Sequence, residues 1–276
     1  QIGNNFSNIT LTGATTMNGW INLEGGLSGP TKTISNNVFS NWICGTAAVT
    51  VLSSNFGDNN TVIYNNTIST ISAAAAITGI NLGGSNKGAL QTCLGNNISD
   101  LSSTGGTVLG ITGGSTAVTT YNINNNTISG LFTSNAGSSA TGIRLLSAAV
   151  SNVFKNKIYN ISCNNATATV NGLDVQGTVS GIFNISNNLV GDLRADLTNS
   201  TNAIRGINLL SVVASTAYNV FYNTVYINAL AGGTNFGTSA ISATVSATAA
   251  NGALNLRNNI LVNTSLAKGT GLTVAY

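Results

Sequence analysis

Histidine is absent from this chain, proline occurs once, at Pro30, and only 5% of the residues are charged. An ordinary soluble domain carries about 25% charged residues. Without histidine, the side chain that most often serves as metal ligand or general base is missing. The few basic residues form no stripe, and Lys155 and Lys157 are the only close basic pair. We therefore expect no nucleic-acid partner.

The composition also argues against disorder and membrane insertion. Disordered chains combine low hydrophobicity with high charge or many prolines, whereas 42% of these residues are hydrophobic. The longest apolar stretches, such as residues 71–80, are short and interrupted by glycine, so none predicts a membrane span. No secretory signal peptide is visible, so a secreted origin requires earlier processing or a start inside a longer precursor.

What the sequence has instead is an internal repeat, which is sought before secondary structure. One asparagine per copy serves as an anchor, with spacings of 29, 30, 30, 30, 32, 35 and 36 residues after a frayed first copy at Asn4 or Asn5. The anchors are Asn37, Asn66, Asn96, Asn126, Asn156, Asn188, Asn223 and Asn259. Apolar residues stand three positions before each anchor, namely Ile34, Ile63, Cys93, Ile123, Val153, Ile185, Val220 and Leu256. Apolar residues also stand two positions after it, namely Phe39, Ile68, Ile98, Ile128, Ile158, Val190, Val225 and Leu261.

The spacing of these apolar positions predicts a bend between two strands. Side chains on one face of a strand lie an even number of residues apart, yet positions −3 and +2 are five apart, so the alternation breaks between them. Asparagine and glycine adopt positive φ most cheaply, and they dominate position −1. That position reads Asn36, Asn65, Gly95, Asn125, Lys155, Asn187, Tyr222 and Asn258. Lys155 and Tyr222 are exceptions, at which the bend is free to differ.

If every copy bends at the same phase, the anchor asparagines stack about 4.8 Å apart and pass amide hydrogen bonds along the column. A second signal, a small residue before an alternating pair, follows the anchor as GINL, GIRL, GLDV, GINL and GLTV, at residues 79–82, 142–145, 172–175, 206–209 and 271–274. The spacer between the two signals varies in length, which locates a surface loop.

The predicted fold is all-β. It is a right-handed, single-stranded parallel β-helix, or solenoid, of about nine coils with an internal Asn ladder, and it forms one domain over residues 1–276. An α-helical fold is excluded because the apolar residues do not recur at a 3.6-residue spacing. A propeller is excluded because each blade needs forty or more residues, more than one copy of this repeat supplies. A β-sandwich would not return the same residue to the same phase eight times.

Several segments resemble a known group of proteins. YNNTIS, FKNKIYNIS, NNLVGDLRA, FYNTVYINA, GTNFGTSAI and above all LRNNILVNTSLAKGTGLTVAY look like the large secreted β-helix repeat proteins of Bacteroidota. The resemblance implies an extracellular or cell-surface location and a long parent chain, commonly ending in a type IX secretion sorting domain. It offers no catalytic residues to transfer. Since the chain opens inside a repeat and no sorting domain follows Tyr276, we expect a segment of a longer or polymerised protein.

The three cysteines are predicted to be buried free thiols. Cys44 and Cys163 occupy the same phase four coils apart, roughly 19 Å, and a disulfide needs Cα atoms within about 7 Å. Cys93 takes the inward −3 position. A metal-binding or nucleophilic role is the alternative, without histidine as ligand or base.

The carboxylates do not pair as a hydrolase requires. They are Glu24, Asp58, Asp100, Asp174, Asp192 and Asp196. Asp100 and Asp192 share position +4 but lie three coils, roughly 14 Å, apart, too far for glycoside hydrolysis. The segment GDLRAD brings together Asp192, Arg194 and Asp196, and we expect an ion-pair cluster there that includes Arg205. A Ca²⁺ site is the alternative.

These features predict an extracellular structural protein without catalytic residues, cofactor or metal. A β-helix ends in open strand edges and an exposed core cross-section, so we expect the rod to extend head to tail into a filament, or to adjoin neighbouring segments of the same chain. The alternative is a surface adhesin or glycan-binding module that uses polar loops and the aromatic residues Tyr159, Tyr226 or Trp20. A polysaccharide lyase or hydrolase ranks below both, because fold alone does not define function.

Overall fold

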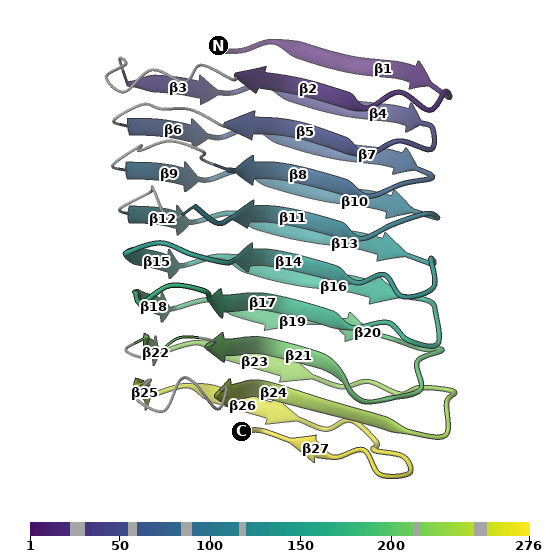
Figure 1. Ribbon diagram of the computed structural model, residues 1–276, viewed down its shortest axis with the longest axis vertical. Coiled ribbons are helices and arrows are strands. Elements are labelled where there is room, and N and C mark those ends of the chain that lie inside the picture. The colour runs from purple at the N-terminus through teal and green to yellow at the C-terminus, as the bar shows by residue number, and fades with distance from the viewer. Residues whose placement is uncertain are drawn as a thin grey trace.

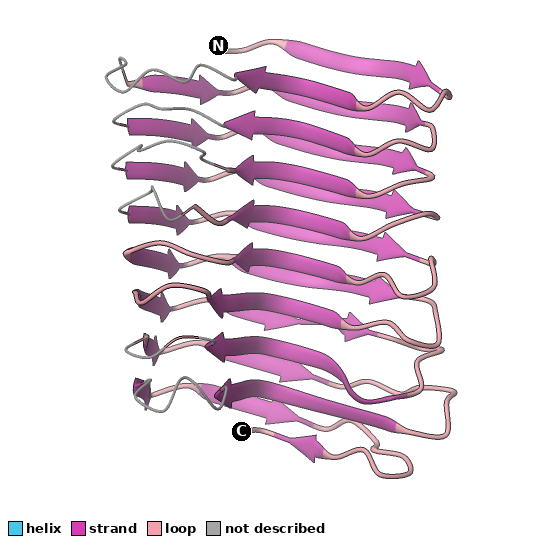
Figure 2. Ribbon diagram, viewed as in Figure 1, coloured by secondary structure: helices cyan, strands magenta, loops and turns pink. Residues whose placement is uncertain are grey.

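The structure, a computed structural model, describes residues 1–22, 31–54, 60–83, 90–115, 120–211, 213, 216–245 and 253–276. In these residues the chain winds into three long sheets whose strands stack rung upon rung, with the N-terminus at one end and the C-terminus at the other (Figure 1). Figure 2 shows strands joined by loops. A helix able to cross a membrane is not found in the part of the chain that the structure describes.

Each turn of the solenoid passes through sheets A, B and C in that order. Sheet A consists of β3 (Lys32–Ser35), β6 (Asn60–Tyr64), β9 (Leu90–Leu94), β12 (Thr120–Asn124), β15 (Val150–Phe154), β18 (Ile182–Ser186), β22 (Ala217–Phe221) and β25 (Ala253–Arg257). Sheet B consists of β1 (Asn5–Leu11), β4 (Val38–Cys44), β7 (Thr67–Ala73), β10 (Asn97–Ser103), β13 (Thr127–Thr133), β16 (Lys157–Cys163), β19 (Leu189–Gly191), β20 (Leu193–Arg194), β23 (Thr224–Ile227) and β26 (Ile260–Asn263). Sheet C consists of β2 (Met17–Asn22), β5 (Val49–Ser54), β8 (Ile77–Leu82), β11 (Val108–Gly113), β14 (Ala140–Leu145), β17 (Val170–Gly177), β21 (Ser200–Ser211), β24 (Phe236–Val245) and β27 (Thr273–Val274).

The predicted right-handed parallel β-helix is confirmed. Strands one turn apart pair in parallel, as β10 does with β7 and with β13, and Figure 1 shows the chain descending with a right-handed winding. Eight turns contribute a strand to all three sheets among the described residues, and β1 and β2 form a first turn without a sheet A strand. Complete turns are thus slightly fewer than the nine expected.

The core consists of apolar columns that run along the solenoid axis. The residues predicted at positions −3 and +2 face inward and pair in register, as Ile63 does with Cys93 and Ile98 with Ile128. In the inner turns they are fully buried. The columns form because a parallel sheet keeps each inward residue directly above its counterpart one turn earlier. The positions counted from each anchor asparagine in the sequence therefore identify the residues that face the core.

Sheet C contains a column of inward-facing glycines that explains four of the five copies of the second sequence signal. Gly271 of GLTV lies outside the column, because Thr273 pairs with Thr238, two positions before the column residue Ala240. Gly79, Gly110, Gly142, Gly172 and Gly206 occupy equivalent positions beside a buried apolar residue. A Cβ atom on Gly110 would lie 2.5 Å from the carbonyl oxygen of Gly142 and 2.8 Å from a methyl carbon of Ile128. At Gly110 a side chain would have to displace these atoms, because two successive residues turn inward where the wall curves. In other turns the same column holds the buried residues Val51 and Ala240.

Sheet B contains a second bend, which the sequence did not predict. Position +4 adopts positive φ in seven turns, at Asn8, Asn41, Thr70, Asp100, Gly130, Asn160 and Asp192. This bend places residue +5, such as Trp42 or Leu101, inward again after residue +2. On the outside it leaves a groove of about 280 Å³ beside Asn41, Thr70 and Asp100.

The spacer between sheets B and C varies in length, as the sequence indicated. It grows from residues 74–76, between β7 and β8, to residues 228–235, between β23 and β24. These connections line one edge of the solenoid (Figure 1), so length changes accumulate there without disturbing the register of the sheets.

Candidate functional site

The predicted Asn ladder is confirmed along the whole solenoid. The side-chain nitrogen of each anchor donates to the side-chain oxygen of the next anchor at 2.9–3.0 Å, from Asn4 through Asn259. The same oxygen accepts the backbone N–H of the preceding anchor at 2.9–3.1 Å. The amide nitrogen also donates to the carbonyl of residue −3 one turn earlier, as Asn126 does to Cys93 at 3.0 Å. Since the anchors from Asn37 to Asn223 are at most 1% exposed, the ladder is a buried and internally satisfied polar column.

The bend before each anchor has the predicted conformation, including at the two exceptions. Lys155 and Tyr222 have φ of 57° and 58°, within the 52–63° range of the other six residues at position −1. The expectation that the bend is free to differ at these two positions is therefore wrong. The ladder imposes one geometry on every turn, and these side chains point outward and accept the left-handed conformation.

A second amide ladder on sheet A was missed from the sequence. Asn152 donates to Asn122 at 2.8 Å, and the same contact recurs from Asn184, Asn219 and Asn255 to the asparagine one turn earlier. These residues occupy position −4 and are half-buried or exposed on the outer face. The signal was visible, because Asn stands at position −4 in the last five copies.

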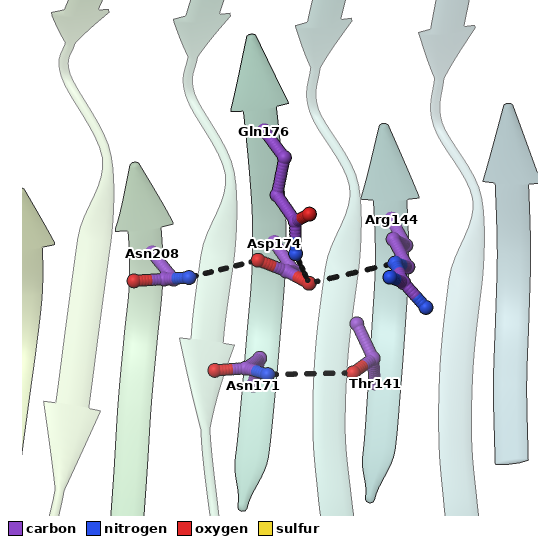
Figure 3. A network of polar contacts seen from close by, with 6 residues as sticks. All are labelled: Thr141, Arg144, Asn171, Asp174, Gln176 and Asn208. Atoms are coloured by element: carbon purple, nitrogen blue, oxygen red, sulfur yellow. Dashed lines mark hydrogen bonds and ion pairs between the residues drawn. The ribbon is translucent and has the colours of Figure 1, made fainter. Parts of the chain in front are cut away.

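A polar cluster lies on the outer face of sheet C (Figure 3). Asp174, on β17, is 5% exposed. One of its oxygens accepts Asn208 at 2.8 Å, and the other accepts Gln176 at 2.9 Å and lies 3.7 Å from Nε of Arg144. Arg144, Asp174 and Asn208 are register partners on β14, β17 and β21. Stacking in register therefore brings together residues that are 30 and 34 positions apart in the chain.

Arg205 belongs to this cluster and not to the segment GDLRAD, so that prediction is wrong. Arg205 stands on β21 in register with Asn171. Burial lowers the pKa of its guanidinium, and the charge of Asp174 acts in the opposite direction. Within GDLRAD, Arg194 pairs with Asp192 at 3.4 Å and donates to Asn160. That ion pair lies on sheet B, and Arg205 faces outward from sheet C.

Several buried polar atoms around the cluster have no hydrogen-bond partner among the described residues. They are Nε of Arg144, Nε of Arg205, Oδ1 of Asn171 and Oδ1 of Asn202. Asn171 is 4% exposed, and its nitrogen reaches Oγ1 of Thr141 only at 3.5 Å. Next to Arg205 along the sheet lies a cavity of about 250 Å³, lined by Thr201, Asn202, Ser239, Thr270, Leu272 and Val274.

The remaining carboxylates do not form a site in the described structure. Asp100 and Asp192 occupy the positive-φ positions of sheet B in turns that are not adjacent, as expected. Among the described residues, no group of three or more His, Cys, Asp or Glu side chains comes together as a metal site. Glu24 and Asp58 lie outside the described residues, as does Pro30.

The three cysteines are free and buried, as predicted. Burial raises the pKa of the Cys44 thiol, that of Cys93 more strongly, and that of Cys163 to about 12. These thiols therefore stay protonated at physiological pH. Cys93 replaces an aliphatic residue in the core, where its sulfur accepts the amide of Asn96 at 3.3 Å.

The aromatic residues considered for glycan binding differ in accessibility. Tyr226 is 47% exposed on sheet B, next to Val262 of the following turn. Tyr159 is half-buried beneath the ammonium group of Lys157, which lies 4.9 Å from the ring centre. Trp20 packs against the core. Of the three residues, Tyr226 is the most exposed.

The stacked sheets and the internal amide column define a parallel β-solenoid. Comparison with protein-family models, with curated proteins and with solved structures found no match to this chain.

Proposed function

We propose that this chain is a structural protein, a stiff β-solenoid rod that forms or contributes to an extracellular or cell-surface filament by end-to-end stacking of coils. The observation that carries the proposal is the ladder, which continues in one phase from Asn4 to Asn259. Together with the core columns it gives every turn the same internal cross-section. Such a unit extends by adding identical rungs, because each coil contacts only its neighbours.

The outermost described coils support extension along the axis. Phe6 and Leu261 occupy the same column as Phe39 and Val225, which are fully buried, yet both remain partly exposed. A further coil, from the same polypeptide or from a second copy, would bury them and pair the strand edges of β1 and β26. A head-to-tail contact of this kind propagates into a fibre.

Surface charge supports assembly as well. With nine basic and six acidic residues in 276, little repulsion separates neighbouring rods, which favours lateral bundling. The extracellular location rests on the resemblance of the repeat segments to secreted β-helix proteins. A catalytic function has weaker support, since Asp100 and Asp192 stand in turns that are not adjacent.

The second candidate is a surface adhesin, which exposed side chains on the outer face of sheet B favour. Leu189, Tyr226, Ile260 and Val262 are 39–60% exposed and stand in neighbouring turns. Exposed apolar groups of this kind mark interaction surfaces. A glycan array probed with the native chain and with Tyr226→Ala tests this candidate, and saturable binding without assembly would favour it over the filament.

Electron microscopy of the purified chain over a range of concentrations tests the filament. Two variants in one strand provide the matched pair. Leu261→Glu places a charge on the core cross-section, whereas Val262→Glu places it on the outer face of the same turn. We expect filaments from the native chain and from Val262→Glu, and single rods from Leu261→Glu. Dispersed native rods at high concentration, or equal loss of filaments in both variants, would contradict end-to-end stacking.

A further inference from the structure

The Asn ladder has a direction, which an inner rung makes explicit. Toward the following turn, the backbone N–H and the side-chain amide of Asn96 both donate to Oδ1 of Asn126, at 2.9 and 3.0 Å. The N–H of Gly95, at position −1, donates in the same direction to the carbonyl of Asn124 at 3.1 Å. At the anchor, each turn therefore presents donors to the turn that follows it and an acceptor, Oδ1, to the turn that precedes it.

The N-terminal rung of the described structure leaves the acceptor side of this contact open. Asn4 donates to Oδ1 of Asn37 through its N–H and its side-chain amide, both at 3.0 Å. Oδ1 of each later anchor accepts two such bonds, whereas Oδ1 of Asn4 accepts none from the described residues. Gly3, at position −1, has φ of 68°, so this rung already contains the bend.

The C-terminal rung leaves the donor side open. Oδ1 of Asn259 accepts the N–H and the side-chain amide of Asn223, at 2.9 and 3.0 Å. The amide nitrogen of Asn259 donates to the carbonyl of Val220 at 2.8 Å and carries a second hydrogen. That hydrogen and the backbone N–H, which earlier anchors donate to the next anchor, have no acceptor in the part of the chain that the structure describes. Asn258, at position −1, has φ of 53°, so the bend is present here as well.

The two end rungs are complementary to each other and not to themselves. Two C-terminal rungs placed face to face would oppose anchor N–H groups, and two N-terminal rungs would oppose anchor oxygens. A C-terminal rung against an N-terminal rung restores the two anchor hydrogen bonds of an inner rung. In that arrangement Leu261 of one copy would lie over Phe6 of the other, since both stand at position +2. Each pairs in register with a fully buried residue of its own chain, Val225 and Phe39 respectively.

We propose that a second copy of this chain docks on the C-terminal rung, with Oδ1 of its Asn4 accepting the N–H and the side-chain amide of Asn259. This joint rests on the proposed end-to-end assembly, and it assigns the partner and the direction of that assembly. The filament is polar, and the ladder and the apolar columns run through every joint. Both surfaces are preformed, because the bends at Gly3 and Asn258 already exist in the single chain, so little ordering cost opposes docking.

A mixing experiment with two end-blocked variants tests the joint. Phe6→Glu blocks the N-terminal rung and Leu261→Glu blocks the C-terminal rung, because each puts a charge on the core cross-section. Ser7→Glu and Val262→Glu are the matched controls, with the charge on the outer face of the same strands. By sedimentation velocity, we expect the native chain and both controls to assemble and each blocked variant to stay monomeric. The equimolar mixture of the blocked variants should form dimers of one copy of each, with a Kd at least tenfold below that of either variant alone.

Asn4→Leu and Asn259→Leu form a second pair, which removes the acceptor and the donors without adding charge and should behave in the same way. Circular dichroism verifies the fold of each variant. Dimers of Phe6→Glu alone or of Leu261→Glu alone, as tight as those of the mixture, would overturn the proposal by showing that like rungs pair. Native assembly by Asn259→Leu would overturn it as well. Native filaments without dimers in the mixture would refute this joint and leave the filament standing, whereas a native chain that stays as single rods would contradict the filament itself.

Discussion

Replacing one inner rung of the ladder, Asn126→Ala, probes what holds successive turns together. The side chain of Asn126 donates to Oδ1 of Asn156 and to the carbonyl of Cys93, both at 3.0 Å. Its oxygen accepts the backbone N–H of Asn96 at 2.9 Å and the side-chain amide of Asn96 at 3.0 Å. The substitution removes these four bonds, together with the weak 3.8 Å contact from the thiol of Cys93, and strands the buried backbone N–H of Asn96.

The magnitude follows from these four bonds. Each intramolecular hydrogen bond contributes about 1 kcal/mol net, and a buried group left without a partner costs 1–3 kcal/mol. We expect the free energy of unfolding of the surrounding turns to fall by about 4 kcal/mol. The matched control is Asn152→Ala in the outer ladder. Its two side-chain contacts, with Asn122 and Asn184, are half-exposed, so water replaces them and the expected loss is below about 1 kcal/mol.

Hydrogen exchange read by mass spectrometry is the suitable assay, because solenoids can open locally and a single global midpoint then misleads. In Asn126→Ala, protection should fall in β9, β12 and β15 and remain near the native level in β3 and β25. A variant as stable as Asn152→Ala would refute the ladder as a main source of stability. A uniform loss of protection along the solenoid would refute local coupling between neighbouring turns.

Two further substitutions test the geometry of the turns, and a third tests the effect of burying tyrosine. Gly110→Val should lower the free energy of unfolding, measured by chemical denaturation, by about 3 kcal/mol or more. The reason is that its Cβ would lie 2.5 Å from the carbonyl oxygen of Gly142. A small effect would mean that the wall yields. Lys155→Gly, which relieves a positive φ of 57°, should raise stability by up to about 1 kcal/mol in the same assay, and a loss would contradict strain at this position. Burial raises the pKa of both Tyr121 and Tyr218 from 10.0 to about 12, so the folded state holds these protons more tightly than the unfolded chain does. Stability should therefore be complete below pH 10 and fall progressively between pH 10 and 12, with a smaller fall in Tyr218→Phe, as followed by circular dichroism.

The ladder and the core columns could be predicted because their signal lies within a few residues and recurs in every turn. Two apolar residues five positions apart with an Asn between them can be recognised without knowing which distant residues they contact. The outer ladder carried a similar signal at position −4, but only in the last five copies. The sheet B bend was harder to find, because its column mixes Asn, Asp and Gly with Thr70, and a β-branched residue rarely adopts positive φ.

The polar cluster around Asp174 was not predicted for a different reason. Residues become neighbours on the wall of a solenoid when they are one turn apart, and not when they are close in the sequence. Arg205 was assigned to Asp192 because they are 13 positions apart, but in a solenoid that separation changes the sheet, whereas one full turn preserves the position. Asp174 and Asn208, 34 positions apart, touch. A site on the wall thus consists of residues one or two turns apart, and turn length near its end varies from 30 to 36 residues. Between β21 and β24 the register also shifts, between Ser200 and Ile204. Sequence spacing alone cannot fix which side chains become neighbours there, and the cavity beside Arg205 lies next to that shift.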